Sequence, residues 1–147
     1  MPSTSELPAW LILPGFLAIW LLASLAISRI SGWAALASSF QLEADFNGDK
    51  WNWQSATMRW GTRLNHCLAI GCDQRGLYLA MMLPFRFCHP PLLIPWREIQ
   101  VSRRRYFLFE YVQLLLGREE RIPLLLFPRT AERLRLAARD RWPGSVN

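Results

Sequence analysis

The stretch PAWLILPGFLAIWLLASLAIS, residues 8–28, decides the architecture of this chain. It contains no charged residue, and 16 of its 21 residues are apolar. As an α-helix it would be about 31 Å long, which matches the hydrocarbon core of a bilayer. We therefore expect a single transmembrane helix at residues 8–28, preceded by a short extracytoplasmic N-terminus at residues 1–7.

The charges beside this segment predict its orientation. Glu6 is the only charged residue before Arg29, and all 17 Lys and Arg residues lie from Arg29 onward. A cleaved signal peptide is the alternative, but such a peptide begins with basic residues. Because Lys and Arg are retained on the cytoplasmic side, we expect the N-terminus outside and the C-terminal domain in the cytoplasm. An odd number of cysteines, Cys67, Cys72 and Cys88, is consistent with reduced structural thiols there.

Outside this segment the chain has the composition of one small globular domain. The apolar fraction of 52% falls to about 48% when residues 8–28 are removed, which is ordinary for a soluble domain. That excludes a disordered chain, a disulfide mini-protein and a multi-spanning membrane protein.

Residues 29–50 are expected to form a juxtamembrane helix and a linker. Ser31 can cap a helix through Gln41, while the polar residues 43–50 predict a loop. The apolar face of that helix either lies in the membrane interface or packs on the domain, and the absence of basic residues from 31–41 favours packing. This face contains Trp33, Leu36, Ala37 and Phe40.

From Trp51 onward the pattern is that of short strands separated by turn signals. A helix then follows that Thr130 can cap and that runs to about Arg141. We expect a mainly-β domain at residues 51–142, a barrel or sandwich of about seven antiparallel strands closed by this C-terminal helix, with residues 143–147 as a tail. The expected strands are 57–60, 66–71, 77–82, 92–96, 98–104, 106–116 and 121–127.

Three short motifs in the domain resemble those of a known family. The runs GLYL at 76–79, IPWREI at 94–99 and IPLL at 122–125, followed by the final helix, resemble the pleckstrin-homology-like (PH-like) and GRAM-like domains of small bacterial membrane proteins. The resemblance implies that residues 94–99 carry the chain from one sheet to the other. It further implies location in the bacterial inner membrane and a role in membrane-proximal binding. The family's phosphoinositide site uses basic residues of the first inter-strand loop, for which Arg59 and Arg63 with Asn65 and His66 are the candidates here.

Aromatic residues outside the regular pattern are the candidates for partner binding. Phe85, Arg86 and Phe87 lie in a loop with three prolines, and aromatic and arginine side chains are enriched at interface hot spots. Filling the open end of the barrel is the alternative role of the two phenylalanines. Trp51 and Trp53 would share a side of an extended strand, unless they dock on the core. Trp20, near the middle of the span, fits a lateral contact with another transmembrane helix.

Arg29, Arg103 and Arg105 are the candidates for anionic lipid headgroups. Alternation along a strand puts Arg104 on the face opposite Arg103 and Arg105, so the basic patch is smaller than the triplet suggests. A solvated or ion-paired surface is the alternative interpretation. A membrane anchor argues against DNA or RNA as a partner.

No catalytic signature is present in the sequence. His66 and His89 are the available bases, and neither lies in an acid–base motif. His66, Cys67, Cys72, Cys88 and His89 are zinc-ligating types, but their spacing contains no Cys-x-x-Cys. We therefore expect no enzyme, metal or cofactor. The expected function is a membrane-anchored binding domain, an accessory or assembly subunit of a larger membrane protein complex with an integral-membrane partner; an anionic-lipid sensor and, less favoured, a metalloprotein or enzyme are the alternatives.

Overall fold

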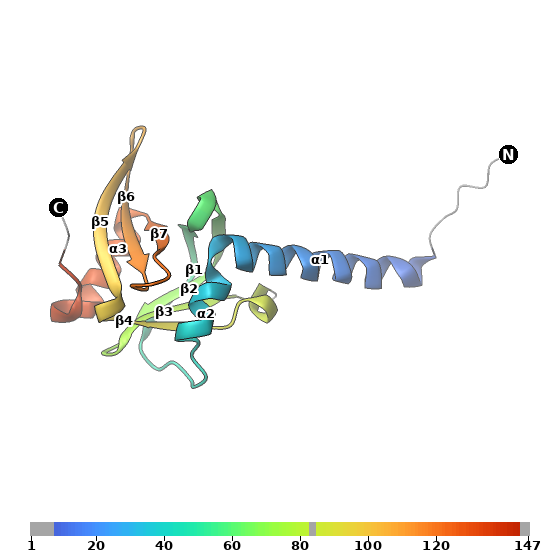
Figure 1. The fold of residues 1–147 in the computed structure, drawn as a ribbon, viewed down its shortest axis with the longest axis horizontal. Coiled ribbons are helices and arrows are strands. Elements are labelled where there is room, and N and C mark those ends of the chain that lie inside the picture. The colour runs from blue at the N-terminus through green and yellow to red at the C-terminus, as the bar shows by residue number, and fades with distance from the viewer. Residues whose placement is uncertain (1–7, 83–84, 145–147) are drawn as a thin grey trace.

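Helix α1 (Ala9–Ser31) projects from a β-sheet domain, and this domain lies at the C-terminal end of the helix (Figure 1). The computed structural model describes residues 8–82 and 85–144, and it describes the backbone but not the side chains of Phe85 and Phe87. α1 is long and apolar enough to cross a membrane. It extends three residues beyond the expected end at residue 28, to Ser31.

Seven antiparallel strands form one sheet in the order β4-β3-β2-β1-β7-β6-β5. The expected mainly-β domain with about seven strands and a C-terminal helix is therefore confirmed at this level. The remaining helices are α2 (Trp33–Phe40) and α3 (Pro128–Ala138), with short 3-10 helices η1 (Arg59–Gly61), η2 (Phe85–Cys88), η3 (Trp96–Glu98) and η4 (Arg139–Arg141). The strands are β1 (Asp49–Thr57), β2 (Arg63–Cys72), β3 (Gly76–Met81), β4 (Leu92–Pro95), β5 (Ile99–Tyr106), β6 (Phe109–Leu116) and β7 (Ile122–Leu126).

The strand boundaries depart most from the sequence-based expectation in two places. The first strand is β1, which begins at Asp49 within the expected loop and ends at Thr57, where a strand was expected to begin. Its register with β2 shifts on both sides of Gln54, and Trp53 has φ 59°, so a bulge interrupts the alternation that normally marks a strand. The break between β5 and β6 lies at residues 107–108 rather than at 105, because this turn is apolar and carries no turn signal.

The sequence IPWREI connects the two edges of the sheet. β4 ends at Pro95, η3 covers the next three residues, and β5 begins at Ile99. β4 and β5 are the outermost strands of the sheet order. This segment therefore carries the chain from one edge of a single sheet to the other edge, and not between two separate sheets as the resemblance implied.

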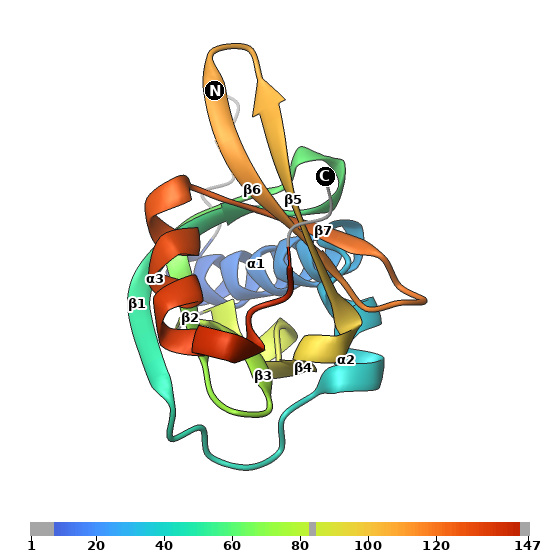
Figure 2. The same ribbon diagram turned by 90° about the vertical axis from the view of Figure 1, so that its left-hand side faces the viewer.

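The core lies inside the curved sheet and is closed by α2 and α3 (Figure 2). Every residue of β3 is buried, and the apolar face of α2 packs on the domain through Trp33 and Leu36, which are fully buried. Packing on the domain, rather than lying in a membrane interface, is therefore confirmed for α2. The largest fully buried side chains are Trp33, Leu36, Leu68, Ile70, Leu77, Leu79, Leu92, Ile94, Leu114, Leu116, Ile122 and Leu124.

A glycine sets the angle between α1 and α2. Gly32 has φ 92°, a left-handed conformation that ends α1 and serves as the N-cap position of α2. A Cβ atom at this position would lie 2.6 Å from Cδ1 of Ile122. Ser31 is the last residue of α1 rather than the cap of α2, although its Oγ still accepts a hydrogen bond from the backbone N–H of Trp33 at 3.4 Å.

Burial along α1 is inverted relative to a soluble helix. Its three buried residues are Ser24, Ser28 and Ser31, which are spaced at i, i+4 and i+7 and form one stripe against the domain. Its large apolar side chains from Trp10 to Ile30 are exposed, except that of Trp20, which is half-buried. A helix inside a soluble core shows the opposite distribution.

The C-terminal helix begins three residues earlier than expected. Pro128 occupies the first turn of α3, where its fixed φ is compatible with a helix start, and the N-cap residue is Phe127. Thr130 is not the cap; it is buried, and its Oγ1 donates a hydrogen bond to Oε1 of Gln54 at 3.4 Å.

Candidate functional site

The β5–β6 hairpin is the most unusual surface of the domain. Eight residue pairs connect its strands, from Ile99 with Leu116 to Tyr106 with Phe109. The turn that joins the strands is two apolar residues, Phe107 and Leu108. Its outer end projects from the sheet (Figures 1 and 2) and exposes residues that are normally buried. The exposed fractions are 49% for Tyr106, 97% for Phe107, 90% for Leu108 and 66% for Phe109.

The two faces of this hairpin carry different chemistry. Residues paired directly across two strands share a face. Arg103 pairs with Val112 and Arg105 with Glu110, so these four residues lie on one face. Arg104 pairs with Tyr111 and Tyr106 with Phe109, which places an arginine among three aromatic rings on the other face. The expected separation of Arg104 from Arg103 and Arg105 is thus confirmed.

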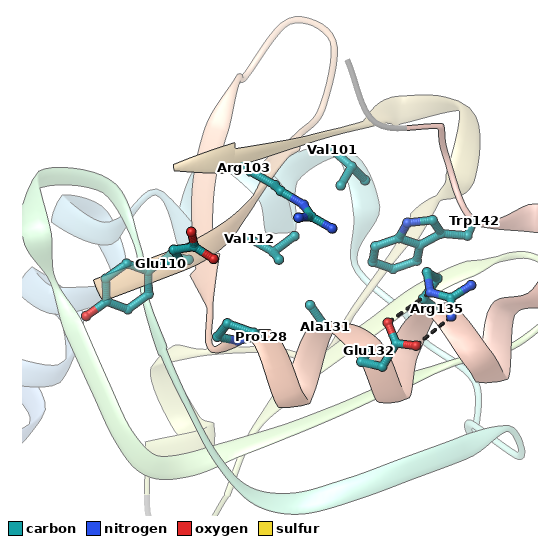
Figure 3. Close-up of a pocket in the computed structure, with 10 residues that line it drawn as sticks. Val101, Arg103, Glu110, Val112, Pro128, Ala131, Glu132, Arg135 and Trp142 are labelled. Atoms are coloured by element: carbon teal, nitrogen blue, oxygen red, sulfur yellow. Dashed lines mark hydrogen bonds and ion pairs between the residues drawn. The ribbon is translucent and has the colours of Figure 1, made fainter. Parts of the chain in front are cut away.

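A groove of about 330 Å³ lies between the Arg103 face of the hairpin and α3 (Figure 3). We call it the β5–α3 groove. Its centre is apolar and its margins carry both charges, with Trp142 near one end. It is lined by Val101, Arg103, Glu110, Tyr111, Val112, Pro128, Ala131, Glu132, Arg135 and Trp142.

The charges in the β5–α3 groove are organised by one ion pair on α3. Arg135 Nε donates to Oε2 of Glu132 at 2.9 Å. This hydrogen bond holds the pKa of Glu132 below its usual range, and the nearby positive charges of Arg135 and Arg103 act in the same direction. The groove therefore presents an ionised carboxylate and guanidinium groups around an apolar centre. It is suited to binding an extended peptide, and nothing in its lining is an activated nucleophile.

A second groove, of about 600 Å³, lies on the opposite face of the hairpin. We call it the aromatic groove. Trp60 on η1, with 83% of its surface exposed, faces it together with the aromatic residues of the hairpin tip. The charged residue in its lining is Arg63, and no carboxylate lies among the lining residues. The lining is Thr57, Met58, Trp60, Gly61, Arg63, Tyr106, Phe107, Phe109, Tyr111, Gln113, Pro123 and Leu125.

η1 is attached to the C-terminal end of α1. Arg59 Nε donates to the carbonyl oxygen of Ile30 at 3.1 Å, and its Nη2 donates to that of Arg29 at 2.8 Å. These carbonyls belong to the last turn of the helix, which has no further intrahelical donors. The aromatic groove therefore begins at the end of α1 and extends to the hairpin tip.

The structure separates the two tryptophans that were expected to act together. Trp51 is half-buried and packs against the core, whereas Trp53 is exposed. The bulge at Trp53 changes the direction of the chain between them, so they do not form one exposed pair.

Within the proline-rich loop, η2 packs along α1. Cys88 Sγ lies 3.9 Å from the carbonyl oxygen of Leu21, and His89, which is buried, meets the ring of Trp33 edge-on at 5.5 Å. Arg86 is exposed, while the side chains of Phe85 and Phe87 lie outside the described residues. Trp20, the expected lateral contact, is half-buried on α1 one residue before Leu21.

The candidate metal ligands do not converge. Among the described residues, no group of three His, Cys, Asp or Glu side chains could hold a metal ion. Cys67, Cys72 and Cys88 are free thiols. Burial, together with the negative charges of Asp49 and Asp73, raises the pKa of Cys72 to about 11, so this thiol is a core group and not a nucleophile.

Sequence reasoning named Arg63 but missed the aromatic residues of the aromatic groove. Trp60 was assigned to a strand, and residues 106–109, YFLF, to the interior of another strand. The available signal was the failure of alternation, because four consecutive apolar residues between RRR and Glu110 cannot all face a core.

Comparisons of this chain with protein-family models, curated proteins and solved structures give no match.

Proposed function

We propose that this protein is a non-enzymatic, membrane-anchored binding domain with a PH-like fold. It serves as an accessory or assembly subunit of a larger membrane protein complex in the bacterial inner membrane. α1 is its single span, with the N-terminus outside and the domain in the cytoplasm. The observation that carries the proposal is the β5–α3 groove, which lies beside the outer edge of the sheet.

The burial pattern of α1 supports an anchor in lipid. Apolar side chains cover its exposed surface and serines form its contact with the domain, which is favourable only if the surrounding medium is apolar. The contacts of Ser31 with Trp33 and of Arg59 with Ile30 join the helix to the domain. These contacts favour a helix that stays attached over a signal peptide that is removed.

The strand order supports a PH-like fold. Four strands, β1 to β4, and three strands, β5 to β7, each form an antiparallel meander, and they are joined through the pairing of Thr57 on β1 with Leu125 on β7. The C-terminal helix α3 then packs against β2 and β6. This arrangement agrees with the resemblance noted for the motifs at 76–79, 94–99 and 122–125.

The β5 edge supports recognition of an extended partner segment. Within the described part of the chain, β5 pairs with β6 alone, so its outer edge is available to a further strand. A peptide added there would gain main-chain hydrogen bonds, while alternate side chains would enter the groove. Val101, Val112 and Ala131 would contact apolar side chains, and Arg103 and Glu132 would select for charge.

The test compares two charge reversals in the full-length chain in its native membrane. Arg103→Glu reverses a charge in the groove, and Arg133→Glu makes the same change at an exposed position of α3 outside the groove lining. After purification in mild detergent, we expect a stoichiometric partner to accompany the wild type and Arg133→Glu but to be lost from Arg103→Glu. The same partner should slow amide hydrogen exchange along β5. Equal recovery of partners by the two variants would overturn the groove as the recognition site.

A further inference from the structure

The tip of the β5–β6 hairpin has a composition that folding does not explain. Two-residue hairpin turns favour glycine and asparagine, which accept positive φ without strain. This turn has Phe107 at φ 55°, followed by Leu108, and both side chains are almost completely exposed. The chain therefore retains a strained, apolar turn that buries nothing within the domain. Such a feature indicates a surface that is covered by something else.

The position of the tip relative to α1 indicates what covers it. Arg59 fixes η1 to the last turn of α1, so the exposed Trp60 lies at the end of the apolar helix. If α1 spans the membrane, as proposed above, its end marks the membrane–water interface, where Trp and Tyr are enriched. The aromatic groove continues from Trp60 to Tyr106 and Phe107, so one aromatic surface extends from the end of the span to the tip.

A tilt of α1 toward the hairpin would bring this surface closer to the bilayer. The hairpin extends sideways from the axis of α1 in both views (Figures 1 and 2), whereas η2 lies on the other side of α1 and further along it. Spanning helices are tilted by about 20° on average. A tilt toward the hairpin moves the tip toward the membrane surface and moves η2, which packs at the level of Leu21, away from the membrane centre.

The charges on the aromatic face fit the headgroups of anionic lipids. Arg63 lines the aromatic groove, and Arg104 lies on the same face of the hairpin as Tyr106 and Tyr111. Arg103 and Arg105, which the sequence suggested for this role, lie on the face that carries Glu110 and the β5–α3 groove. Arginine beside interfacial aromatic residues is the combination that binds an anionic leaflet.

We propose that the tip at residues 106–109, with Trp60, is a second membrane contact that inserts into the interface of the leaflet on the domain's side. This inference rests on the proposed span and goes beyond partner binding, because it fixes how the domain is oriented on the membrane. With the tip and α1 both held, the domain cannot rotate freely about its anchor. The β5–α3 groove, on the opposite face of the hairpin, is then presented away from the lipid.

Site-directed spin labels in the full-length chain test the insertion. Nitroxides are placed one at a time at Phe107→Cys, Leu17→Cys and Gln74→Cys in a Cys67→Ser, Cys72→Ala, Cys88→Ser background whose far-UV spectrum matches the wild type. The protein is reconstituted in phosphatidylcholine vesicles with or without phosphatidylglycerol. Collisions with oxygen report lipid, and collisions with a water-soluble nickel complex report solvent. Leu17 serves as the reference within α1, and Gln74, in the exposed β2–β3 turn, as the reference in water.

After reconstitution, we expect the label at residue 107 to collide less often with the nickel complex. Its accessibility to nickel should then approach that of the label at residue 17. In vesicles with phosphatidylglycerol, Arg104→Gln should raise the nickel accessibility of the label at residue 107 toward that of the label at residue 74. Arg103→Gln should leave the accessibility at residue 107 unchanged. A label at 107 that stays as accessible to nickel as the label at 74 overturns the insertion. If that label becomes protected only in native membranes, a protein covers the tip, and the lipid contact is also overturned. If the label at 17 is itself aqueous, the proposed span fails, and that outcome is distinct from failure at the tip alone.

Discussion

Two hairpins of this domain have opposite distributions of polar and apolar residues. In the β2–β3 hairpin, the turn is polar and all of β3 is buried. Asp73 Oδ1 accepts hydrogen bonds from the backbone N–H groups of Arg75 at 2.7 Å and Gly76 at 3.2 Å, and its Oδ2 forms an ion pair with Arg75 at 2.8 Å. In the β5–β6 hairpin, the turn is Phe107 and Leu108, and the outer halves of the strands are exposed.

The β2–β3 hairpin therefore maintains the fold, whereas the β5–β6 hairpin presents an apolar surface to its surroundings. Apolar area buried in β3 contributes to stability, whereas apolar area exposed at residues 106–109 contributes nothing to it in water. Exposing this apolar surface to water is unfavourable, so its presence indicates that a lipid or another molecule contacts it. The same kind of substitution, made once in each hairpin, should therefore change the free energy of unfolding by very different amounts.

The largest difference is expected from one substitution made in each hairpin. Leu79→Ala removes a fully buried side chain from β3 and should lower the free energy of unfolding by about 2–5 kcal/mol. Leu108→Ala, at 90% exposure, should change it by less than about 0.5 kcal/mol. Denaturant unfolding of the full chain in detergent micelles, monitored by near-UV circular dichroism, measures both. Comparable losses for the two variants would contradict the division between the hairpins.

The buried thiol at the end of β2 should make stability fall at alkaline pH. The pKa of Cys72 is raised from 9.0 to about 11 by burial and then by Asp49 and Asp73. Between these values the unfolded chain loses the thiol proton while the folded chain keeps it, so the unfolded state gains stability as pH rises. The free energy of unfolding should fall by about 2 kcal/mol across this interval.

Cys72→Ala provides the control for that pH dependence. Its unfolding free energy should lack the decrease assigned to this thiol between pH 9 and pH 11, although the variant is less stable overall. Cys67 contributes in the same direction in both proteins, because burial also raises its pKa. An identical slope with and without Cys72 would show that its burial does not control the alkaline limit.

The polar turn of the first hairpin predicts a smaller effect at acidic pH. Although burial opposes the shift, hydrogen bonds from Arg75 and Gly76 lower the pKa of Asp73 below its usual value. The stability contributed by the carboxylate is present above its unfolded pKa and is lost as pH falls through the folded value. Asp73→Asn should therefore cost about 1 kcal/mol at neutral pH and progressively less below about pH 4. Thermal unfolding of both proteins from pH 7 to pH 2 checks this convergence.

The smallest effect on the fold is expected at the apolar turn. Phe107→Gly supplies a residue that suits positive φ, and Leu108→Ser replaces an exposed apolar side chain with a polar one, so stability should be unchanged or raised by about 1 kcal/mol. Thermal melting in micelles measures this change in stability. The control is Gly61→Ala, which introduces backbone strain instead, because Gly61 has φ 69° and open space around it. A large loss of stability in the Gly–Ser variant would mean that the tip supports the fold after all.

Much of the architecture follows from local patterns in the sequence. The uncharged run at residues 8–28 indicates a helix by its length and composition, and the turn residues at 73–76 indicate the β2–β3 hairpin because they favour a tight turn between two apolar runs. Trp53 and Phe107 were not predictable in this way. Both adopt positive φ, which is uncommon for aromatic residues, so no propensity rule indicates a bulge or a turn at these positions.

The sequence alone determined the apolar helix, the β-rich domain and its C-terminal helix. These properties depend on composition and short-range periodicity. Only the tertiary structure decided that serines dock α1 on the domain, that Arg59 ties Trp60 to the end of α1, and that Trp60 shares a groove with Tyr106. The physical reason is that each of these contacts joins residues distant in sequence, and their positions depend on how the sheet curves and packs.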